Sequence, residues 1–447
     1  MQRKLAVIPH DFLGLGYEIS SVAIPGLLSA ENRSYVELVR TLSTGGVIRV
    51  GGNTSDDASF ERDGQAVSAA KGSVVNRRNL QQLGSFLDAT NWSLIWGLNL
   101  GSTNMGSTNL GSTGQEQAAA EAEAVAAVAK GRLLAFEIGN EPDLFGRGTG
   151  HRPKSYSYET YLSEFQRYKS AILAKLPQAP FAGPDVAGAT EWVSKFAKDE
   201  GRDLKLLTHH YYRECANPSS TLDKLLNVDP KLAPKLAALR LASSTSNLPY
   251  RICETNSFCG GGKPGISDSF GAALWVLDFM FQLASAGCAG VNMETGLNQL
   301  GFVSSYSPIR QDGGGAYAAA PEYYGMLAFA YAGQGAIVAT DCNPGGANIT
   351  GYAVVSADRS LTVTIINKEA SLYAGVSLSI PNNLGNARVF RLSAPSLQAK
   401  DNVTFGGAGI SPDGTWTPLS KEFLHCTAGR GEIDVPAATA VVLKWMV

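Results

Sequence analysis

Two apolar runs in the chain end in a glutamate. LLAFEIGNEPDLF (133–145) carries Glu141 where the run ends, and PYRICETNS (249–257) carries Glu254 in the same position. Acidic residues after an apolar run also fit the start of a helix, where the helix dipole favours negative charge. Two carboxylates about 5–5.5 Å apart, however, are what a retaining glycosidase needs, because one protonates the glycosidic oxygen and the other attacks the anomeric carbon. We therefore predict that Glu141 and Glu254 meet over a sugar, with Glu294 of GVNMETG as a third candidate.

The position of Glu141 follows from strand alternation. If residues 133–141 form a strand, Glu137, Gly139 and Glu141 share one face. Glu141 then lies where the strand passes into its loop, which in a barrel of parallel strands is where catalytic residues are found.

Other apolar runs also end in aromatic and polar residues, which suit the stacking and hydrogen bonding of sugar rings. These are Tyr17-Glu18, GGNTSDD (51–57), THHYY (208–212) and SSYSPI (304–309). His209 and His210 have neither a His-x-x-x-His spacing nor a second ligand cluster nearby. We therefore predict no metal site and no cofactor.

The elements that must position these residues repeat along the chain. Eight apolar runs alternate with segments of helical spacing between residues 12 and 335, which predicts a (β/α)8 barrel. The expected strands lie in residues 13–20, 46–53, 93–100, 133–140, 180–187, 204–212, 249–257 and 289–295. No Gly-x-Gly-x-x-Gly follows the first of them, which argues against a dinucleotide fold.

From residue 336 to 447 the pattern changes to short alternating strands separated by Gly, Pro and Asn turns. This predicts a β-sandwich domain, to which residues 1–11 can add a strand. The segments 56–77 and 101–113, the second a repeat of Gly-Ser-Thr, are candidate walls of the barrel mouth, although a plain surface loop also fits the repeat.

The composition limits which kinds of partner the protein can bind. The 447 residues carry a net charge of −2, so there is no basic field for nucleic acid, and no apolar run reaches the ~20 residues of a membrane span. We expect a monomer that is secreted or periplasmic, although no signal peptide is visible. Six cysteines are too few for a disulfide scaffold, but Cys342 and Cys426 lie in the same domain and can pair.

Several of these motifs together resemble glycoside hydrolase family 79, which contains β-glucuronidases and heparanases. The segments that carry the resemblance are FEIGNEPDLF, ICETNSFCGGGKPGISDSFGAALWVLD, DFLGLGYE, GVIRVGGNTSDD, LTHHYY, GVNM and PEYYGMLAFA. The family belongs to a clan of barrels with catalytic glutamates on strands four and seven. The resemblance implies that Glu141 is the acid/base, that Glu254 is the nucleophile, and that Asn140 bonds the sugar 2-hydroxyl.

The resemblance also implies a site for the glucuronate carboxylate. Gly260 and Gly261 match the glycine pair that offers backbone N–H groups to it, and Tyr306 matches the tyrosine that completes the site. The residues expected to line the sugar pocket are Glu18 and either Tyr211 or Tyr212. Relatives often have tyrosine before the glycine pair, where this chain has Cys259, which can pair with Cys215 and brace the loop.

The resemblance implies a retaining β-glucuronidase acting on glucuronic-acid-containing saccharides. A heparanase-like endo-β-glucuronidase acting on heparan sulfate is the alternative, and it would place basic residues beside the cleft. Candidates are Arg62, Lys71, Arg77, Arg78, Arg152 and Lys154. A catalytically inactive barrel that only binds acidic sugars is a remote alternative, because both carboxylates are present.

Overall fold

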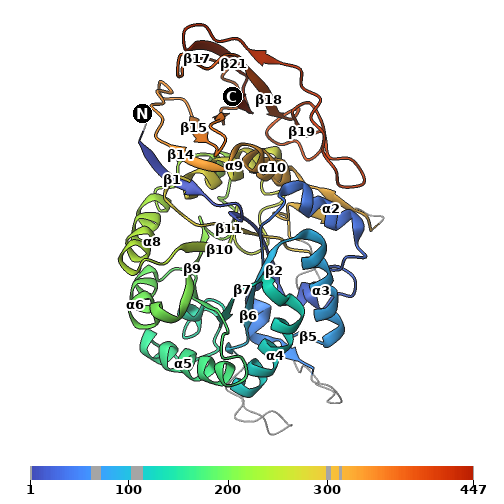
Figure 1. Ribbon diagram of the computed structural model, residues 1–447, viewed down its shortest axis with the longest axis vertical. Coiled ribbons are helices and arrows are strands. Elements are labelled where there is room, and N and C mark those ends of the chain that lie inside the picture. Colours follow the sequence, from blue (N-terminus) through green and yellow to red (C-terminus); the bar gives the residue numbers. More distant parts are fainter. Residues whose placement is uncertain (1–2, 62–71, 102–113, 298–303, 312–314, 446–447) are drawn as a thin grey trace.

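The computed structural model describes residues 3–61, 72–101, 114–297, 304–311 and 315–445. A closed barrel of parallel strands lies below an antiparallel sheet in Figure 1, and both chain ends lie beside that sheet. The expected barrel with an added β domain is confirmed. The residue boundaries of the two domains, at 12 and 335, stay a prediction.

The barrel strands follow one another in chain order around the ring, and the last strand pairs with the first to close the barrel. They are β2 (Leu13–Glu18), β3 (Val47–Gly51), β6 (Ser93–Leu98), β7 (Leu133–Ile138), β8 (Phe181–Val186), β9 (Leu204–Tyr212), β10 (Tyr250–Asn256) and β11 (Val291–Glu294). β7 is thus the fourth strand and β10 the seventh, with β8 and β9 between them on the shorter side. Since all strands are parallel, their carboxyl ends meet at one mouth.

Helices cover the outside of the barrel (Figure 1). They are α1 (Ile19–Val22), α2 (Arg33–Leu42), α3 (Arg77–Thr90), α4 (Gly114–Ala129), α5 (Tyr158–Lys175), α6 (Thr190–Glu200), α7 (Leu222–Leu226), α8 (Leu232–Ser246), α9 (Phe270–Ser285) and α10 (Pro321–Ala332). The ends of α3 show how the sequence sets its limits. Asn76 and Asn79 form a reciprocal capping box at its start, and Asn91 takes the left-handed conformation at its end.

The C-terminal domain contains an eight-stranded sheet and a two-stranded one. The larger sheet contains β1 (Lys4–Ile8), β14 (Gly335–Val338), β15 (Ile349–Val355), β16 (Leu361–Asn367), β18 (Ala387–Ser393), β19 (Thr404–Phe405), β20 (Phe423–Leu424) and β22 (Thr439–Trp445). The smaller pairs β17 (Ala374–Ser379) with β21 (Arg430–Val435). Because β1 pairs antiparallel with β14, the N-terminal strand does join the C-terminal sheet. Two further strand pairs flank the barrel: β4 (Ser59–Phe60) with β5 (Val74–Val75), and β12 (Ile309–Gln311) with β13 (Tyr317–Ala319).

The two domains share one apolar core and a buried polar contact. Ile366, Phe390 and Val442 of the large sheet belong to the same buried cluster as the side chains of α9 and α10. At this interface the carboxylate of Asp278 on α9 accepts a 2.6 Å hydrogen bond from Nζ of Lys368, and both side chains are almost fully buried.

The pairing of Cys342 with Cys426 that the sequence left open does not occur. Both are free thiols, because the Cys342 side chain lies beside Gly351 on β15 whereas the Cys426 side chain lies beside Gly431 on β21. None of the helices in the described ranges combines the length and the apolar character that a membrane span requires.

Candidate active site

Glu141 lies beyond the end of strand β7 and does not continue its extended backbone. β7 ends at Ile138, and both Gly139 and Glu141 then have left-handed backbone, with φ of 84° and 49°. The expectation that Glu137, Gly139 and Glu141 share a face is therefore wrong, because the alternation stops with the strand. The amide of Glu141 donates to the carbonyl of Asp185 at 2.9 Å, which holds the strained residue at the mouth.

Glu254 on β10 points toward Glu141. One carboxylate oxygen of each residue, together with a ring nitrogen of His210, lies within 4.8 Å of the others. The two carboxylate side chains keep 14% and 13% exposure, so both can reach a bound molecule. A nearest oxygen–oxygen approach within 4.8 Å suits the ~5–5.5 Å between the carboxyl groups of a retaining pair better than the ~6.5–9.5 Å of an inverting pair.

Glu254 is held by two donors. Nη1 of Arg49 donates to Oε2 at 2.8 Å, and the hydroxyl of Tyr212 donates to Oε1 at 3.1 Å. Both donors stabilise the ionised form that a nucleophile needs, and together they fix the plane of the carboxylate.

Arg49 is the electrostatic centre of the site. Its fully buried guanidinium also donates to Glu137 at 3.2 Å, to Asp185 at 2.7 Å and to the side-chain oxygen of Asn140 at 2.9 Å. Burial would lower the pKa of Arg49, but the charges of Asp185, Glu137 and Glu254 raise that pKa well above its ordinary value. Burial, then the neighbouring charge of Asp185, raises the pKa of Glu137 to about 7.

His210 links the two sides of the site. Its Nε2 lies 2.7 Å from Asp185, and its Nδ1 lies 3.0 Å from Glu141. Burial would lower the pKa of His210, but the carboxylates of Asp185 and Glu254 raise that pKa well above its ordinary value. The raised pKa favours the imidazolium form of His210, whose two N–H groups would face Asp185 and Glu141.

The environment of Glu141 favours its protonated form. Burial raises the pKa of Glu141, and this effect outweighs the hydrogen bond and charge of His210, which act in the opposite direction. The charge of Glu254 raises it further. A raised pKa suits the member of a glycosidase pair that gives its proton to the leaving group.

Asn140 and Glu18 are fixed by the loop after β3. The side-chain amide of Asn140 donates to Asn53 at 3.1 Å. Glu18 accepts from the backbone N–H groups of Asn53 at 3.2 Å and Thr54 at 2.7 Å. Burial and then the charge of Glu254 raise the pKa of Glu18 to about 7, which places Glu18 close to the nucleophile candidate.

The loop after β10 carries the glycine pair. Cys215 and Cys259 form a disulfide, so the pairing expected from the resemblance is present and joins this loop to the one after β9. Gly260 and Gly261 have φ of 77° and 85°, a region that residues with a Cβ rarely adopt. The carbonyl of Gly261 accepts from the amide of Ser305 at 2.7 Å, which brings the glycine pair beside Tyr306.

The structure separates the two tyrosines of β9. Tyr212 faces the barrel interior with His210, whereas Tyr211 faces outward, where its hydroxyl donates to Asp229 and its ring stacks on Phe279. Tyr212 thus joins the carboxylates and Tyr211 does not. Tyr306 is buried. The pKa of Tyr212 is raised mainly by burial and by Glu254, with smaller contributions from Tyr306 and Glu294.

Sequence reasoning missed Arg49, Asp185 and the role of His210. The signal for Arg49 was its place in VIRVGG, because a charged residue inside a fully apolar strand must have buried partners. The sequence indicated Asp185 as a site residue less clearly. Burial would raise its pKa, but Arg49 and His210 outweigh burial and hold that pKa well below its ordinary range.

Two groups of side chains have metal-ligand spacing in the described ranges. One is Glu141, His210 and Glu254, and the other is Glu137, Asp185 and Cys253. The guanidinium of Arg49 already donates to a carboxylate in each group, so the positive charge that an ion would supply is present. The expected absence of a metal stays a prediction, and the physical argument favours it.

Paired carboxylates at the ends of strands four and seven of a parallel barrel are the arrangement of retaining glycoside hydrolases. Residues 30–281 match the model of the glycosyl hydrolase family 79 N-terminal domain, and residues 351–442 match that of the family 79 C-terminal beta domain. The chain belongs to glycoside hydrolase family 79.

Curated relatives include two fungal proteins named β-glucuronidase. The one from Aspergillus niger is 29% identical over 281 residues, which are 56% of this chain and 51% of the relative. The one from Neurospora crassa is 29% identical over 322 residues, which are 63% and 55% of the two chains. The chain therefore spans about half the length of the curated relatives it matches.

Solved structures share the fold over nearly the whole chain. A 4-O-α-L-rhamnosyl-β-D-glucuronidase from Fusarium oxysporum has a TM-score of 0.81 at 19% identity, covering 99% of this chain and 98% of its own. A family 51 α-L-arabinofuranosidase from Bifidobacterium longum has a TM-score of 0.69 at 12% identity, covering 100% and 98%. At these identities the likeness establishes the fold.

Proposed function

We propose that this protein is a retaining β-glucuronidase. The observation that carries the proposal is the pair Glu141 and Glu254, whose nearest carboxylate oxygens lie within 4.8 Å of each other, with burial raising the pKa of Glu141 and with Arg49 and Tyr212 donating to Glu254. Family membership and the two relatives named β-glucuronidase support it.

In the first step, a carboxylate oxygen of Glu254 attacks the anomeric carbon. The bond from that carbon to the aglycone oxygen breaks, and Glu141 gives its proton to the departing oxygen. In the second step, the Glu141 carboxylate takes a proton from water, whose oxygen attacks the same carbon and releases Glu254. Two inversions keep the β configuration, and no cofactor is required.

Recognition of the glucuronate carboxylate is proposed for the braced loop after β10. Backbone N–H groups of Gly260 and Gly261 would approach the anion without a Cβ in the way, and the hydroxyl of Tyr306 would complete the site. The disulfide and the bond from Ser305 to Gly261 support this proposal, because they hold the glycine pair beside Tyr306.

Replacing Glu141 with glutamine tests the acid/base role. For an alkyl glucuronide, whose leaving group needs a proton, we expect kcat/KM to fall by about 10²–10⁴-fold. For an activated aryl glucuronide, formation of the glycosyl-enzyme should fall far less. The wild type should lose kcat/KM as pH rises through the raised pKa of Glu141, and Glu141→Gln should lack this alkaline limb.

The matched control is Glu432→Gln, an exposed carboxylate on β21, which should leave both substrates and the pH profile unchanged. Equal losses for the two leaving groups in Glu141→Gln would contradict an acid/base role.

Replacing Tyr306 with phenylalanine tests carboxylate recognition. Loss of a hydrogen bond to a charged group is worth ~1.5–3 kcal/mol, so kcat/KM for a β-glucuronide should fall roughly 10–100-fold. A β-glucoside lacks the carboxylate, so its slow hydrolysis should change little. The ratio of the β-glucuronide rate to the β-glucoside rate therefore measures the loss of carboxylate recognition. Tyr317→Phe, at a half-buried tyrosine on β13, serves as the control. An equal loss on both sugars would mean that Tyr306 does not read the carboxylate.

Endo action on heparan sulfate is the second candidate. Arg77 and Arg78 are exposed at the start of α3, on the side of the mouth, and can meet a sulfated chain. Arg152 cannot, because it is buried and bonded to Glu164 and to three backbone carbonyls. Arg62, Lys71 and the rest of 62–71 in the first candidate wall segment, and residues 102–113 of the second, lie outside the described residues. Size analysis of heparan sulfate digests separates the two actions, since an exo enzyme shortens the polymer only from its end.

We also propose that the protein is exported, as a monomer that does not bind nucleic acid. The Cys215–Cys259 disulfide supports export, because such bonds persist in oxidising compartments. Non-reducing peptide mapping of protein recovered from culture medium tests export. Light scattering tests whether the protein is a monomer.

A further inference from the structure

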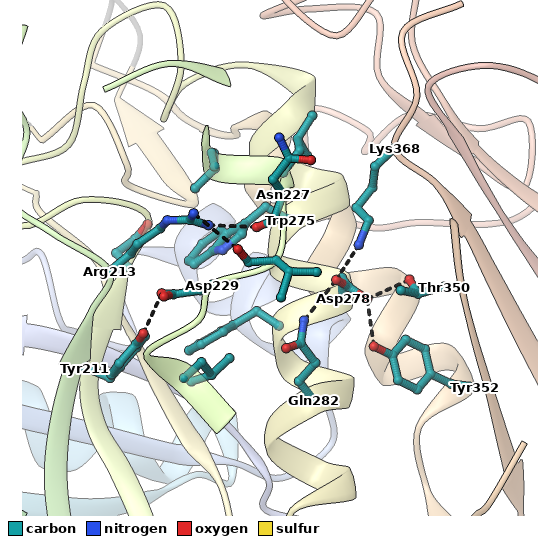
Figure 2. A pocket seen from close by; sticks show the side chains of 16 residues that line it. Tyr211, Arg213, Asn227, Asp229, Trp275, Asp278, Gln282, Thr350, Tyr352 and Lys368 are labelled. Atoms are coloured by element: carbon teal, nitrogen blue, oxygen red, sulfur yellow. Dashed lines mark hydrogen bonds and ion pairs between the residues drawn. The ribbon is translucent and has the colours of Figure 1, made fainter. Parts of the chain in front are cut away.

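A second site candidate lies outside the barrel, between the two domains. A cavity of about 190 Å³ opens between β9, the segment 225–232, α9, strand β15 of the C-terminal sheet and Lys368, which follows β16 (Figure 2). Tyr211 lines it from the outer face of β9, so the strand itself separates the cavity from His210 and Tyr212. The cavity is therefore distinct from the carboxylate site, and a ligand bound in it is independent of the β-glucuronidase activity.

Aromatic rings form one wall of this interdomain cavity. Trp275 is partly exposed and stacks on Phe279, with centroids 5.2 Å apart and planes 18° apart. Phe279 in turn stacks on Tyr211 at 6.1 Å and 20°. Rigid aromatic surface of this kind provides the apolar contact for a small ring-shaped ligand.

The charges of the cavity are balanced. Lys368 is paired with Asp278, whose carboxylate also accepts from Thr350 and Tyr352, each at 2.7 Å. The other two charged residues of the lining have opposite signs. Arg213 donates to the carbonyls of Asn227 and Val228, and Asp229 accepts from Tyr211. A ligand with a net charge would therefore bring an uncompensated charge into a partly buried space.

Hydroxyl groups match this lining better than a carboxylate does. A hydroxyl both donates and accepts, so neighbouring hydroxyls can accept from Arg213 and donate to Asp229. A carboxylate could only accept, so it could bond to Arg213 but would also face the acceptor-only carboxylate of Asp229. The volume suits a single small ring, since pockets for larger ligands begin at roughly 300 Å³.

We propose that the interdomain cavity binds a neutral monosaccharide, with its ring against Trp275 and its hydroxyls between Arg213 and Asp229. Since the segment 225–232 forms the exposed side, with Val228 83% exposed, a small sugar has a path from solvent.

The test is ligand-observed saturation-transfer NMR with D-glucose, D-xylose and D-glucuronate on the full chain. We expect saturation transfer to the neutral sugars, with a dissociation constant at least tenfold weaker (~1.4 kcal/mol) in Trp275→Ala and in Arg213→Ala. Tyr373→Ala, a 60% exposed aromatic on the C-terminal domain, is the control and should bind as the wild type does. Turnover of an aryl β-glucuronide should be unchanged in all three variants.

Arg213 is partly exposed, so Arg213→Ala decides the matter if Trp275→Ala does not fold. Absence of transfer to neutral sugars, or equal transfer in wild type and Arg213→Ala, would overturn the proposal. Transfer to D-glucuronate that falls in Arg213→Ala while transfer to neutral sugars does not would overturn it in favour of an acidic ligand.

Discussion

Replacing Glu254 with alanine should lower kcat for an aryl β-glucuronide on the order of 10⁵–10⁶-fold, as expected when a nucleophile is removed. Without Glu254 its two hydrogen-bond partners, Tyr212 and Arg49, remain, and both act only as donors at this position. The gap left by the carboxylate can admit a small anion such as azide, which would attack the same face of the sugar. Added azide should therefore restore turnover and yield an α-glucuronyl azide.

Stereochemistry gives an independent check on this assignment. Proton NMR of the wild-type reaction should show the β anomer of glucuronic acid first, with the α anomer appearing only by mutarotation. Initial release of the α anomer would contradict the retaining mechanism. Glu294→Ala is the competing variant, since Glu294 is buried at the end of β11. If Glu254→Ala keeps more than about 1% of activity and Glu294→Ala loses it with azide rescue, the nucleophile is Glu294.

The barrel could be predicted because each of its units repeats the same local signal. Most barrel strands contain a short apolar run, and the helices between them alternate with these runs; α2, for example, has a periodic buried face of Tyr35, Leu38, Val39 and Leu42. Eight such units close a parallel barrel whatever the details of their contacts. Glu141 and Glu254 could be predicted for the same reason, since strand ends meet at one mouth.

The contacts around the carboxylates could not be predicted. Arg49 joins β3 to β7, β8 and β10, and nothing in the spacing of these segments says which interior side chains will touch. The conformation of Glu141 was also beyond reach, because the left-handed backbone depends on the bond from its amide to Asp185 on the next strand.

Side-chain direction was predictable only where the strand is regular. Along β9 the alternation holds, so Tyr212 and Tyr211 had to point to opposite sides, and only the choice of side was open. Cysteine pairing was harder. Cys215 and Cys259 have Cα atoms 4.2 Å apart although 44 residues separate them in sequence, a closeness that the parallel pairing of β9 with β10 creates.

Replacing Arg49 with methionine should cost about 3–5 kcal/mol of unfolding free energy, since removing one partner leaves buried charge uncompensated. Three carboxylates lose their cation, those of Glu137, Asp185 and Glu254. Activity should fall with stability, because Glu254 loses one of its two donors. Urea unfolding followed by circular dichroism measures the first effect, and single-turnover kinetics the second.

The pH dependence separates this role from simple packing. The pKa of Glu137 in the folded protein is raised to about 7, so its folded form binds more protons than its unfolded form between the ordinary glutamate pKa of ~4.3 and that value. This group therefore destabilises the fold as pH rises toward 7. Without Arg49, ionising the cluster of Glu137, Asp185 and Glu254 costs more free energy. Arg49→Met should therefore lose most unfolding free energy at pH 8 and clearly less at pH 5.5.

Arg251 offers the matched control, because it is also a fully buried barrel arginine but donates to Asn292 and to backbone carbonyls. Burial lowers the pKa of Arg251, whereas the carboxylates raise that of Arg49. Arg251→Met should therefore lose stability to a similar extent at both pH values and keep a larger share of its kcat. If the two variants lost equal stability with the same pH dependence, Arg49 would be a packing residue.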